Sequence, residues 1–249
     1  MGRIQTFQTE QTRKHSNRVV SFLLDLLIPK FCMSCGRWGE FLCSHCSTQI
    51  MHVTGQVCFA CKAPSMWGIT HSFCRGKCIL DGVQVLYTYN TITRALIHAA
   101  KYKNLRNIFL DMLKSKPNIT ISFSFLLKNK NIAFIPIPLS KGRLLNRGYN
   151  QAEVLSNYFA TSFSFPVLLK TLIRTRETKP QSKLKSLSLK KDNVKDAFSV
   201  STITPLPEVC ILVDDVLTTG ATLMEAGTLL KKHGAKKVFA ITLTGAFHY

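Results

Sequence analysis

Residues 209–222 have the sequence VCILVDDVLTTGAT, in which an apolar run leads into two acids and a turn rich in threonine. The run at 209–213 is typical of a strand that is buried on both faces of a sheet. Residues 220–233 have the apolar spacing of a helix, and Gly234 follows as a stop signal. The segment therefore predicts a buried strand that brings Asp214 and Asp215 to its C-terminal end, then a tight turn and a helix.

The predicted turn offers the groups that bind a phosphate. A helix N-terminus presents unpaired N–H groups and a positive dipole end, and Thr218, Thr219 and Thr222 add hydroxyls. Gly220 allows a close backbone approach. Acids would repel a bare anion, so we expect them to accept hydrogen bonds from ribose hydroxyls of the same ligand or to help hold Mg2+. The sequence lacks the G-x-x-x-x-G-K-[ST] pattern of P-loop proteins. The alternative is an ordinary strand–loop–helix whose Asp and Thr cap the helix.

The rest of the second half alternates strands with helices. Apolar runs predict strands at 83–89, 132–138 and 238–243, and helical spacing predicts helices at 91–103 and 150–163. This alternation is typical of an α/β fold, a mostly parallel sheet with flanking helices. With 249 residues, 46% of them apolar, the chain can bury the core of one large domain or two smaller ones.

The first half is dominated by cysteine. Eight of the nine cysteines lie between residues 32 and 78, in three C-x-x-C pairs and one pair with three intervening residues. A two-residue gap lets two thiolates reach one tetrahedral zinc ion at about 2.3 Å, and two such pairs make one four-thiolate site. The expected ligands of two structural Zn2+ sites, a double zinc ribbon, are Cys32, Cys35, Cys43, Cys46, Cys58, Cys61, Cys74 and Cys78.

The sequence leaves the pairing of these cysteines open, since both adjacent and interleaved pairs are compatible with the spacing. Four disulfides would need an oxidising compartment, and a redox dithiol explains one C-x-x-C pair but not a series. His45, His52 and His71 could substitute as ligands, but eight cysteines suffice, so we expect these histidines to be bystanders. Cys210 lies in an apolar run and is expected to be a buried small hydrophobe.

The chain is strongly basic. It has 33 Lys and Arg against 13 Asp and Glu, a net charge of +20, and residues 101–195 hold 19 of these cations and only four acids. Such a field attracts polyanions, namely nucleic acid, phosphorylated metabolites or anionic lipid, although a solvated cationic surface is the simpler interpretation of any single charge run.

The N-terminal region shows no secretion signal by its pattern. The apolar stretch at 19–28 contains Asp25, has helical spacing and lacks a small-residue cleavage site, so we expect a short amphipathic helix in a cytoplasmic protein with no membrane span. The expected organisation is a disordered basic N-terminus at 1–18, the helix and zinc ribbon at 19–80, and an α/β domain at 81–249.

Several motifs together resemble a known family. Residues 209–222 resemble the phosphoribosyl-pyrophosphate (PRPP) motif of type I phosphoribosyltransferases. The order of motifs over residues 26–243 resembles the ComF family of competence proteins, which are tied to natural transformation in bacteria. After the cysteine pairs, these motifs are IHAAKYK at 97–103, IPIP at 135–138, RLLNRGYNQ at 143–151, PQS at 180–182, Asn193-Val194 with Phe198, and VDD at 213–215.

The resemblance implies a phosphoribosyltransferase-like domain that binds PRPP with Mg2+. By matching position, Asp214 and Asp215 would bind the ribose hydroxyls, and Lys101 and Arg147 would lie near the pyrophosphate; these four are the candidate catalytic residues. The full set of expected PRPP-binding residues is Val213, Asp214, Asp215, Leu217, Thr218, Thr219, Gly220, Ala221 and Thr222.

Residues 174–196 resemble the mobile hood that closes over PRPP in this superfamily, and a loop or two-stranded flap is expected there. This chain departs from the family pattern in the hood, with Lys190 where an arginine is usual and Asp196 where a glycine is usual. Lysine keeps the charge but lacks the bidentate fork of arginine.

Three functions are compatible with these features. The favoured expectation is a cytoplasmic competence factor that handles imported single-stranded DNA through its PRPP- and phosphate-binding domain. The first alternative is an active phosphoribosyltransferase that transfers ribose phosphate from PRPP to an unidentified acceptor. The second is an interaction module whose zinc ribbon docks a helicase, a recombination protein or another DNA-uptake protein.

Overall fold

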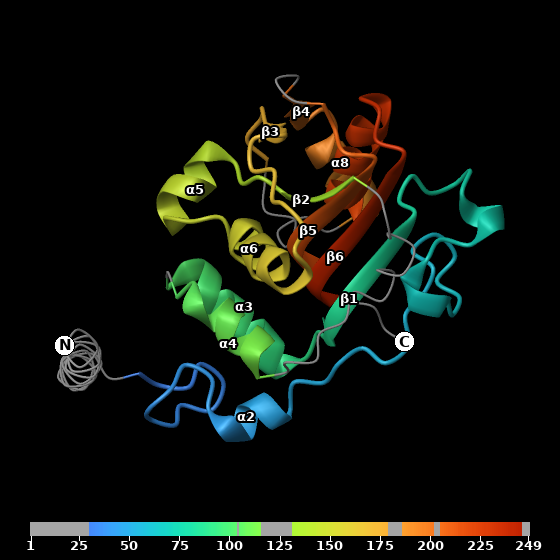
Figure 1. The fold of residues 1–249 in the computed structure, drawn as a ribbon. Helices are drawn as coiled ribbons and strands as arrows, with labels where there is room; N and C mark the ends of the chain where they lie inside the picture. The colour runs from blue at the N-terminus through green and yellow to red at the C-terminus, as the bar shows by residue number, and fades with distance from the viewer. Residues whose placement is uncertain (1–29, 104, 116–130, 179–185, 202–204, 246–249) are drawn as a thin grey trace, which may run out of the picture.

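A computed structural model describes residues 30–103, 105–115, 131–178, 186–201 and 205–245, so the region 1–18 and the helix expected at 19–28 lie outside it. Its main sheet has four parallel strands in the order β1-β6-β5-β2 (Figure 1). The strands are β1 (Gly82–Thr88), β2 (Ile132–Pro136), β5 (Val209–Leu217) and β6 (Lys237–Gly245). The predicted α/β class with a parallel sheet is confirmed.

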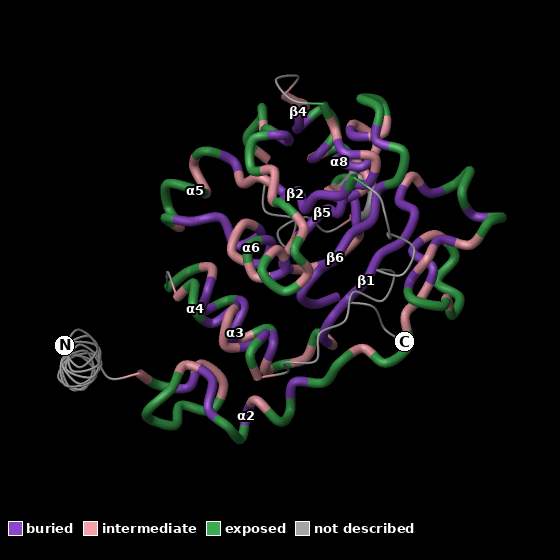
Figure 2. Tube along the Cα trace, in the orientation of Figure 1, coloured by how far each residue is buried: buried purple, intermediate pink, exposed green. Residues whose placement is uncertain are grey.

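Helices cover both faces of this sheet. Three of them, α3 (Thr91–Tyr102), α4 (Asn107–Lys114) and α6 (Gln151–Phe163), pack over one face, and α8 (Ala221–Lys232) covers the other. Figure 2 shows the sheet as the buried centre between these two layers. The arrangement follows from the period of two in a strand. In β5, for example, Ile211 and Val213 face the α3/α4/α6 layer, whereas Cys210 and Leu212 face α8.

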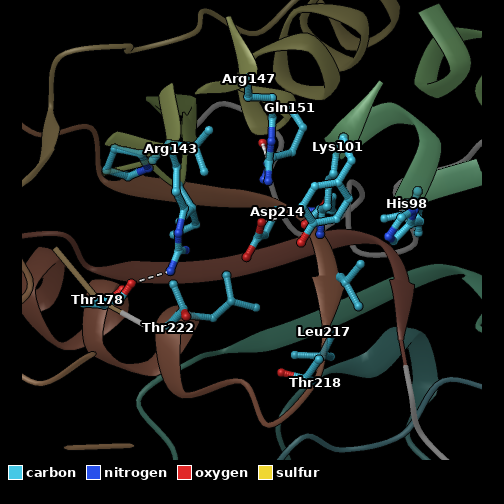
Figure 3. Close-up of a pocket in the computed structure, with 18 of the residues that line it drawn as sticks. His98, Lys101, Arg143, Arg147, Gln151, Thr178, Asp214, Leu217, Thr218 and Thr222 are labelled. Atoms are coloured by element: carbon cyan, nitrogen blue, oxygen red, sulfur yellow. Dashed lines mark hydrogen bonds and ion pairs between the residues drawn. The ribbon is translucent and has the colours of Figure 1, made fainter. Parts of the chain in front are cut away.

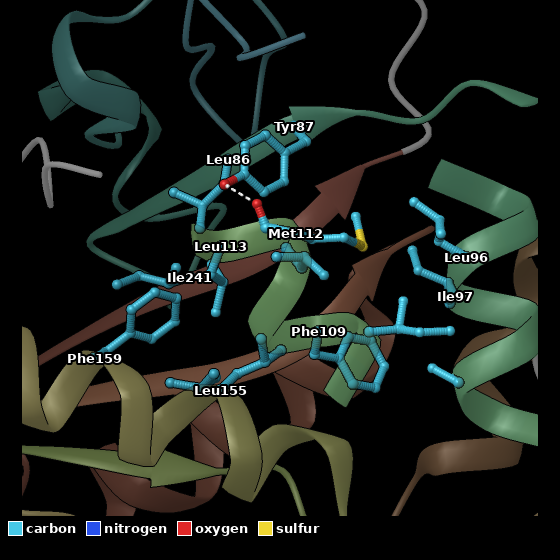
Figure 4. Packing of buried hydrophobic residues seen from close by; sticks show 14 of the residues in the cluster. Leu86, Tyr87, Leu96, Ile97, Phe109, Met112, Leu113, Leu155, Phe159 and Ile241 are labelled. Atoms are coloured by element: carbon cyan, nitrogen blue, oxygen red, sulfur yellow. Dashed lines mark hydrogen bonds between the residues drawn. The ribbon is translucent and has the colours of Figure 1, made fainter. Parts of the chain in front are cut away.

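The larger core lies under α3, α4 and α6 (Figure 4). Phe109 and Met112 of α4 are fully buried there beside Leu96 of α3. The buried hydroxyl of Tyr87 donates to the Met112 carbonyl at 3.3 Å, which satisfies the one polar group of this side chain. The apolar faces of these helices therefore anchor α3 on the sheet.

The C-terminal end of β5 extends further than the apolar run predicts. Its pairing with β6 continues past Val213, with Asp214 opposite Thr242 and Leu217 opposite Gly245. The strand thus carries both acids as ladder residues, and the helix α8 begins only after a turn at residues 218–220.

A second, antiparallel sheet pairs β3 (Leu172–Arg174) with β4 (Phe198–Val200), and α7 (Leu187–Val194) lies between them in sequence. This is the segment expected to form a hood. Residues 179–185 and the side chain of Lys190 lie outside the described residues. Asp196, at the position where the family usually has glycine, adopts a left-handed φ of 54°.

The cysteine segments contain only short helices, α2 (Ser44–Thr48) and the 3-10 turns η1 (Met66–Gly68) and η2 (Ser72–Cys74). The first cysteine segment packs with the α3/α4 face of the sheet, and the second packs with the α8 face. The connection runs along the edge strand, where Val53 N donates to Leu86 O at 2.9 Å. Within the described ranges, every helix is too short or too polar to cross a lipid bilayer.

Candidate functional site

The end of β5 places two acids beside a lysine of α3. Lys101 Nζ lies 2.6 Å from Asp215 Oδ2, in an ion pair that is close but not aligned as a hydrogen bond. Asp215 is only 3% exposed, and its backbone N–H donates to Asp214 Oδ1 at 2.8 Å. The strand therefore presents Asp214 to the space above the sheet while Lys101 compensates the charge of Asp215.

Burial and, to a smaller extent, the neighbouring charge of Asp215 raise the pKa of Asp214 to about 7, against the opposing effect of Lys101. Both causes disfavour the charged form of Asp214: burial removes its hydration, and the nearby carboxylate of Asp215 repels it. Two acids in this arrangement attract hydrogen-bond donors or a cation, either of which would relieve their repulsion.

Residues 218–222, here called the threonine turn, connect the acids to α8. Gly220 is the N-cap of α8 with φ of 74°, a left-handed conformation that glycine adopts without strain. The N–H of Ala221, the first residue of α8, donates to Thr219 Oγ1 at 3.4 Å. Gly220 and the first turn of α8 line the same cavity as Asp214 and Asp215.

The RGYNQ motif at 147–151 forms the junction of α5 (Lys141–Arg147) and α6. Gly148 provides a left-handed turn with φ of 74°, and Asn150 caps α6 and donates to Ile137 O at 3.1 Å. Tyr149 is buried, and its hydroxyl donates to Ala100 O of α3 at 2.7 Å. Tyr149 is thus a packing residue, and the junction is tied to both β2 and α3.

Arg147 ends α5 on the side of the acids. Its Nη1 donates to Gln151 Oε1 at 2.6 Å, so the last residue of the motif orients the first. Figure 3 shows Arg147, Lys101 and Arg143 arranged around Asp214.

Two arginines that the sequence analysis did not select complete this cationic wall. Arg143 lies one helical turn before Arg147 and donates to Thr178 O at 2.5 Å. Arg174, at the end of β3, donates to Pro138 O at 3.2 Å and to the Thr178 hydroxyl. Burial lowers the pKa of Arg174 to about 10, and the nearby charge of Arg143 acts in the same direction. Both guanidinium groups remain charged at neutral pH. Arg174 of the hood donates to Pro138 O, and Arg143 of α5 donates to Thr178 O of the hood, so one arginine on each side links the hood to the site.

These groups enclose a cavity of about 760 Å3. Five Arg and Lys side chains and two Asp side chains line it. The lining includes the predicted residues Lys101, Arg147, Asp214, Asp215, Leu217, Thr218, Gly220 and Thr222. Val213, Thr219 and Ala221 belong to the same strand and turn but are not among its lining residues. The additional lining residues that bear charged or aromatic groups are Tyr89, Arg94, His98, Tyr102, Arg143 and Arg174.

The cysteines form two groups that could each hold a metal ion. The first metal group consists of Cys32, Cys35, Cys43 and Cys46, with all four sulfurs within 4.8 Å of one another. Cys35 and Cys43 are separated by 3.6 Å between their sulfurs. Four thiolates at about 2.3 Å from one zinc ion would be about 3.8 Å apart in a tetrahedron, so this group fits zinc. The pairing is the adjacent one.

The second metal group differs from the sequence expectation. It contains Cys58, Cys61 and Cys74 together with His71, whose Nδ1 lies 3.4 Å from Cys61 Sγ. A sulfur and a nitrogen bound to one zinc ion would be about 3.5 Å apart, so these atoms also fit a tetrahedral site. His71 was expected to be a bystander, and its position at this site is therefore a correction.

Cys78, expected to complete the second metal group, is not in it. Its N–H donates to Cys74 O at 3.1 Å, one helical turn along the chain, and its sulfur lies 3.8 Å from Met224 Sδ of α8. With three intervening residues instead of two, Cys78 lies a full helical turn after Cys74, and its side chain is buried in the core. Cys78 is buried there, and burial raises the pKa of its thiol.

Comparison with known proteins places these features in context. Residues 124–246 match the family model described as "Phosphoribosyl transferase domain". The chain is 29% identical over 215 residues to Competence protein ComFC of Bacillus subtilis, which covers 82% of this chain and 84% of that protein. It is 27% identical over 236 residues to DNA utilization protein YhgH of Escherichia coli K12, covering 86% and 96%. Competence protein F of Haemophilus influenzae is 39% identical over 109 residues, covering 43% of this chain and 47% of that protein.

Proposed function

Because the chain is a homologue of Competence protein ComFC and of DNA utilization protein YhgH and contains a phosphoribosyl transferase domain, we propose that it is a cytoplasmic competence factor that handles single-stranded DNA. Its cavity binds PRPP or a related phosphorylated ribose. The observation that carries this proposal is the cavity itself, in which two acids and a threonine turn face a wall of arginine and lysine.

The residues of this cavity suit the three parts of PRPP. Asp214 and Asp215 accept hydrogen bonds from the ribose hydroxyls. The threonine turn and the first N–H groups of α8 bind the 5′-phosphate, since a helix N-terminus favours an anion. The pyrophosphate lies toward Lys101, Arg143 and Arg147, where guanidinium groups bind phosphate oxygens in pairs. In this division the acids face the ribose, and the cations and N–H groups face the phosphates.

Mg2+ fits the same cavity, because carboxylate oxygens and ligand phosphates are the partners that this ion prefers. When bound with PRPP, Mg2+ would neutralise pyrophosphate charge. Asp214 and Asp215 are the residues of this chain that would face it, while Lys101 holds Asp215 in place until a ligand arrives.

The two metal groups are proposed as structural zinc sites. Their ligands would be the four cysteines of the first group and Cys58, Cys61, His71 and Cys74 of the second. Closed four-ligand sites without an open position are typical of structural rather than catalytic zinc. Elemental analysis tests this directly, with about two zinc ions expected per chain.

An active phosphoribosyltransferase is the second candidate, and the placement of Arg147 and Lys101 favours it. Transfer would break the bond between C1 of the ribose and the pyrophosphate while a nucleophile of the acceptor bonds to C1, and the pyrophosphate would leave with the bond electrons. The cations would stabilise the departing negative charge, and the chain would contribute positioning and electrostatics rather than a covalent intermediate.

The ligand site is tested with the double variant Asp214→Asn/Asp215→Asn. Each lost hydrogen bond to a charged acceptor costs about 1.5–3 kcal/mol, so PRPP binding in the presence of Mg2+ should weaken at least about a hundredfold in calorimetric titration. The matched control is Glu208→Gln, which removes an acid next to the opposite end of β5 and should leave binding unchanged. Undiminished binding in the double variant would reject this site.

The DNA-binding role is tested by salt titration. Each phosphate neutralised on single-stranded DNA contributes about −0.7 to the slope of log K against log salt, so charge reversal of two contacting lysines should flatten the slope by about 1.4. The hood variant is Lys183→Glu/Lys185→Glu, and its control is Lys232→Glu/Lys236→Glu, two exposed lysines near the N-terminal end of β6. A slope of zero in the unmodified protein would exclude phosphate-driven binding.

Transformation assays separate the two roles in the cell. Loss of transformation in Asp214→Asn/Asp215→Asn, with the hood variant unaffected, would indicate that the PRPP site is what the cell requires. The opposite result would indicate that DNA charge contacts are required.

A further inference from the structure

A side chain of the second metal group lies directly against the threonine turn. A Cβ atom placed on Gly220 would be 2.2 Å from Phe59 Cζ and 2.6 Å from Phe59 Cε2, and the third nearest atom also belongs to Phe59. These distances are far below van der Waals contact, so the ring occupies the space beside this glycine. Phe59 is only 9% exposed. The edge of the ring therefore supports the backbone of the turn from behind.

The metal group fixes the position of this ring. Phe59 lies between Cys58 and Cys61, two members of the group. Lys62 N donates to Cys58 O, and Cys58 N donates to Ala63 O, each at 2.9 Å, which closes a tight loop around the ring's attachment point. Lys62 Nζ also lies 4.1 Å from the centroid of the Phe59 ring, within the range of a cation–π contact.

The segment that follows the metal group supports α8 further along its length. Cys78 Sγ lies 3.8 Å from Met224 Sδ, and a Cβ atom placed on Gly227 would be 2.7 Å from Leu80 Cδ2. These contacts hold the body of the helix. Only the Phe59 contact reaches its N-cap, so among these three contacts Phe59 alone can control the geometry of the turn.

We propose that Phe59 is a positioning residue through which the second metal group holds the threonine turn in its phosphate-binding conformation. With the metal bound, the loop at residues 58–63 is rigid and the ring presses on Gly220. Without the metal, the ring loses its fixed attachment, the turn samples other conformations, and the fraction of molecules ready to bind a phosphate falls. The ligand of the turn rests on the proposed function, but the mechanical link between metal and turn does not.

The test uses the full-length, zinc-loaded protein and the variant Phe59→Ala. Backbone amide hydrogen exchange at residues 218–222 should become faster, while zinc content by elemental analysis stays equal to that of the unmodified protein. The dissociation constant for PRPP should rise about tenfold, as expected if the competent turn is populated about a tenth of the time. Phe59→Leu, which keeps an apolar side chain on the same loop, should restore part of both effects and also serves if Phe59→Ala does not fold.

The control is Leu80→Ala. It removes a buried side chain that packs against α8 at Gly227, away from the N-cap Gly220. It should lower the melting temperature without accelerating exchange at the turn. Removal of zinc by a chelator should accelerate exchange at 218–222 in the unmodified protein and add little in Phe59→Ala, because the ring is the proposed link.

The outcomes separate this inference from the proposed function. Unchanged exchange at the turn in zinc-loaded Phe59→Ala and Phe59→Leu would overturn the inference, whatever the protein binds. If exchange accelerates but the unmodified protein binds no PRPP, the mechanical link holds and the proposed ligand is wrong. Equal exchange effects in Leu80→Ala would show that general destabilisation, not Phe59, governs the turn.

Discussion

At the scale of single residues, Gly220 is constrained in two ways, by its own backbone conformation and by contact with Phe59. Its φ of 74° disfavours any residue with a Cβ, and Phe59 fills the place where that Cβ would be. We expect Gly220→Ala to lower the free energy of unfolding by about 2–4 kcal/mol, combining left-handed strain with overpacking. Urea denaturation measures this change.

Gly36 provides the matched control, since its φ is also 74° but a Cβ placed there meets nothing within 4 Å. Gly36→Ala should therefore cost only the backbone strain, about 1–2 kcal/mol, provided that zinc content is unchanged. Phe59→Ala should rescue part of the excess loss in Gly220→Ala. Equal losses in the two alanine variants would show that the Phe59 contact is not restrictive.

We expect the charged form of Asp214 to lower the stability of the folded protein. Its folded-state pKa of about 7 lies above the ordinary aspartate value of about 3.9, because burial and Asp215 disfavour the charged form. A raised carboxyl pKa means that the folded state binds the proton more tightly, so stability falls as pH rises from about 4 to about 7 and then levels off.

The variant Asp214→Asn removes this titration. It should raise the melting temperature relative to the unmodified protein, by an amount that grows between pH 4 and pH 7 and is constant above. Thermal unfolding at a series of pH values measures the difference. A gain that shrinks toward neutral pH would contradict the raised pKa.

At the scale of elements, Asp81 joins the start of β1 to β6 and α8. Its carboxylate accepts from Val238 N at 2.9 Å and lies 2.7 Å from Lys231 Nζ and 3.0 Å from Lys237 Nζ. Burial opposes ionisation, but these partners prevail and the pKa of Asp81 is lowered. Asp81→Asn should cost about 1–3 kcal/mol at neutral pH, because a buried acceptor loses its charge-assisted bonds.

The pH trend for Asp81→Asn has the opposite sign to that of Asp214→Asn. The unmodified protein gains stability from Asp81 above the ordinary pKa of an aspartate and loses it as pH falls through the lowered folded-state value. The deficit of Asp81→Asn should therefore shrink in acid. Denaturant titrations at neutral pH and below pH 4 compare the two, and a deficit independent of pH would contradict the ion-pair role.

The elements also show how far sequence alone predicts this molecule. The strands and helices of the second half are foreseeable because their apolar runs have the period of their own secondary structure. The extension of β5 through Leu217 is not, because it depends on pairing with Thr244 and Gly245 of another strand. Arg174 was missed for the same reason, since only the fold brings the end of β3 to the cavity. Arg143 could have been predicted from the sequence, because it lies one helical turn before Arg147 in the same helix.

The metal groups show a subtler limit. Spacing predicts that cysteines bind metal, but a pair with three intervening residues leaves open which side chain fills the fourth position. Here His71 lies beside Cys61, while the core takes Cys78 against Met224. Which side chain lies in the second metal group thus depends on packing against α8, which no local pattern reveals.

At the scale of the whole molecule, the two metal groups lie on opposite faces of one sheet, joined by the segment that runs along β1. The first packs with α3 and α4 through Leu42 and Ile50, and the second packs with α8 and the threonine turn. Because the two groups pack on opposite faces of the sheet, loss of one metal ion should loosen one face and leave the other unchanged.

We therefore expect Cys46→Ser and Cys74→Ser to have different consequences although each should lose one of two zinc ions. Cys46→Ser should accelerate hydrogen exchange in α3 and α4, which carry Lys101 toward the acids, and leave residues 218–222 protected. Cys74→Ser should accelerate exchange at 218–222 and the start of α8 and leave α4 protected. Each should lower the melting temperature, because a structural zinc site contributes folding free energy. Identical exchange patterns in the two variants would mean that the groups act as one unit, and the division of the molecule into two separately braced faces would be wrong.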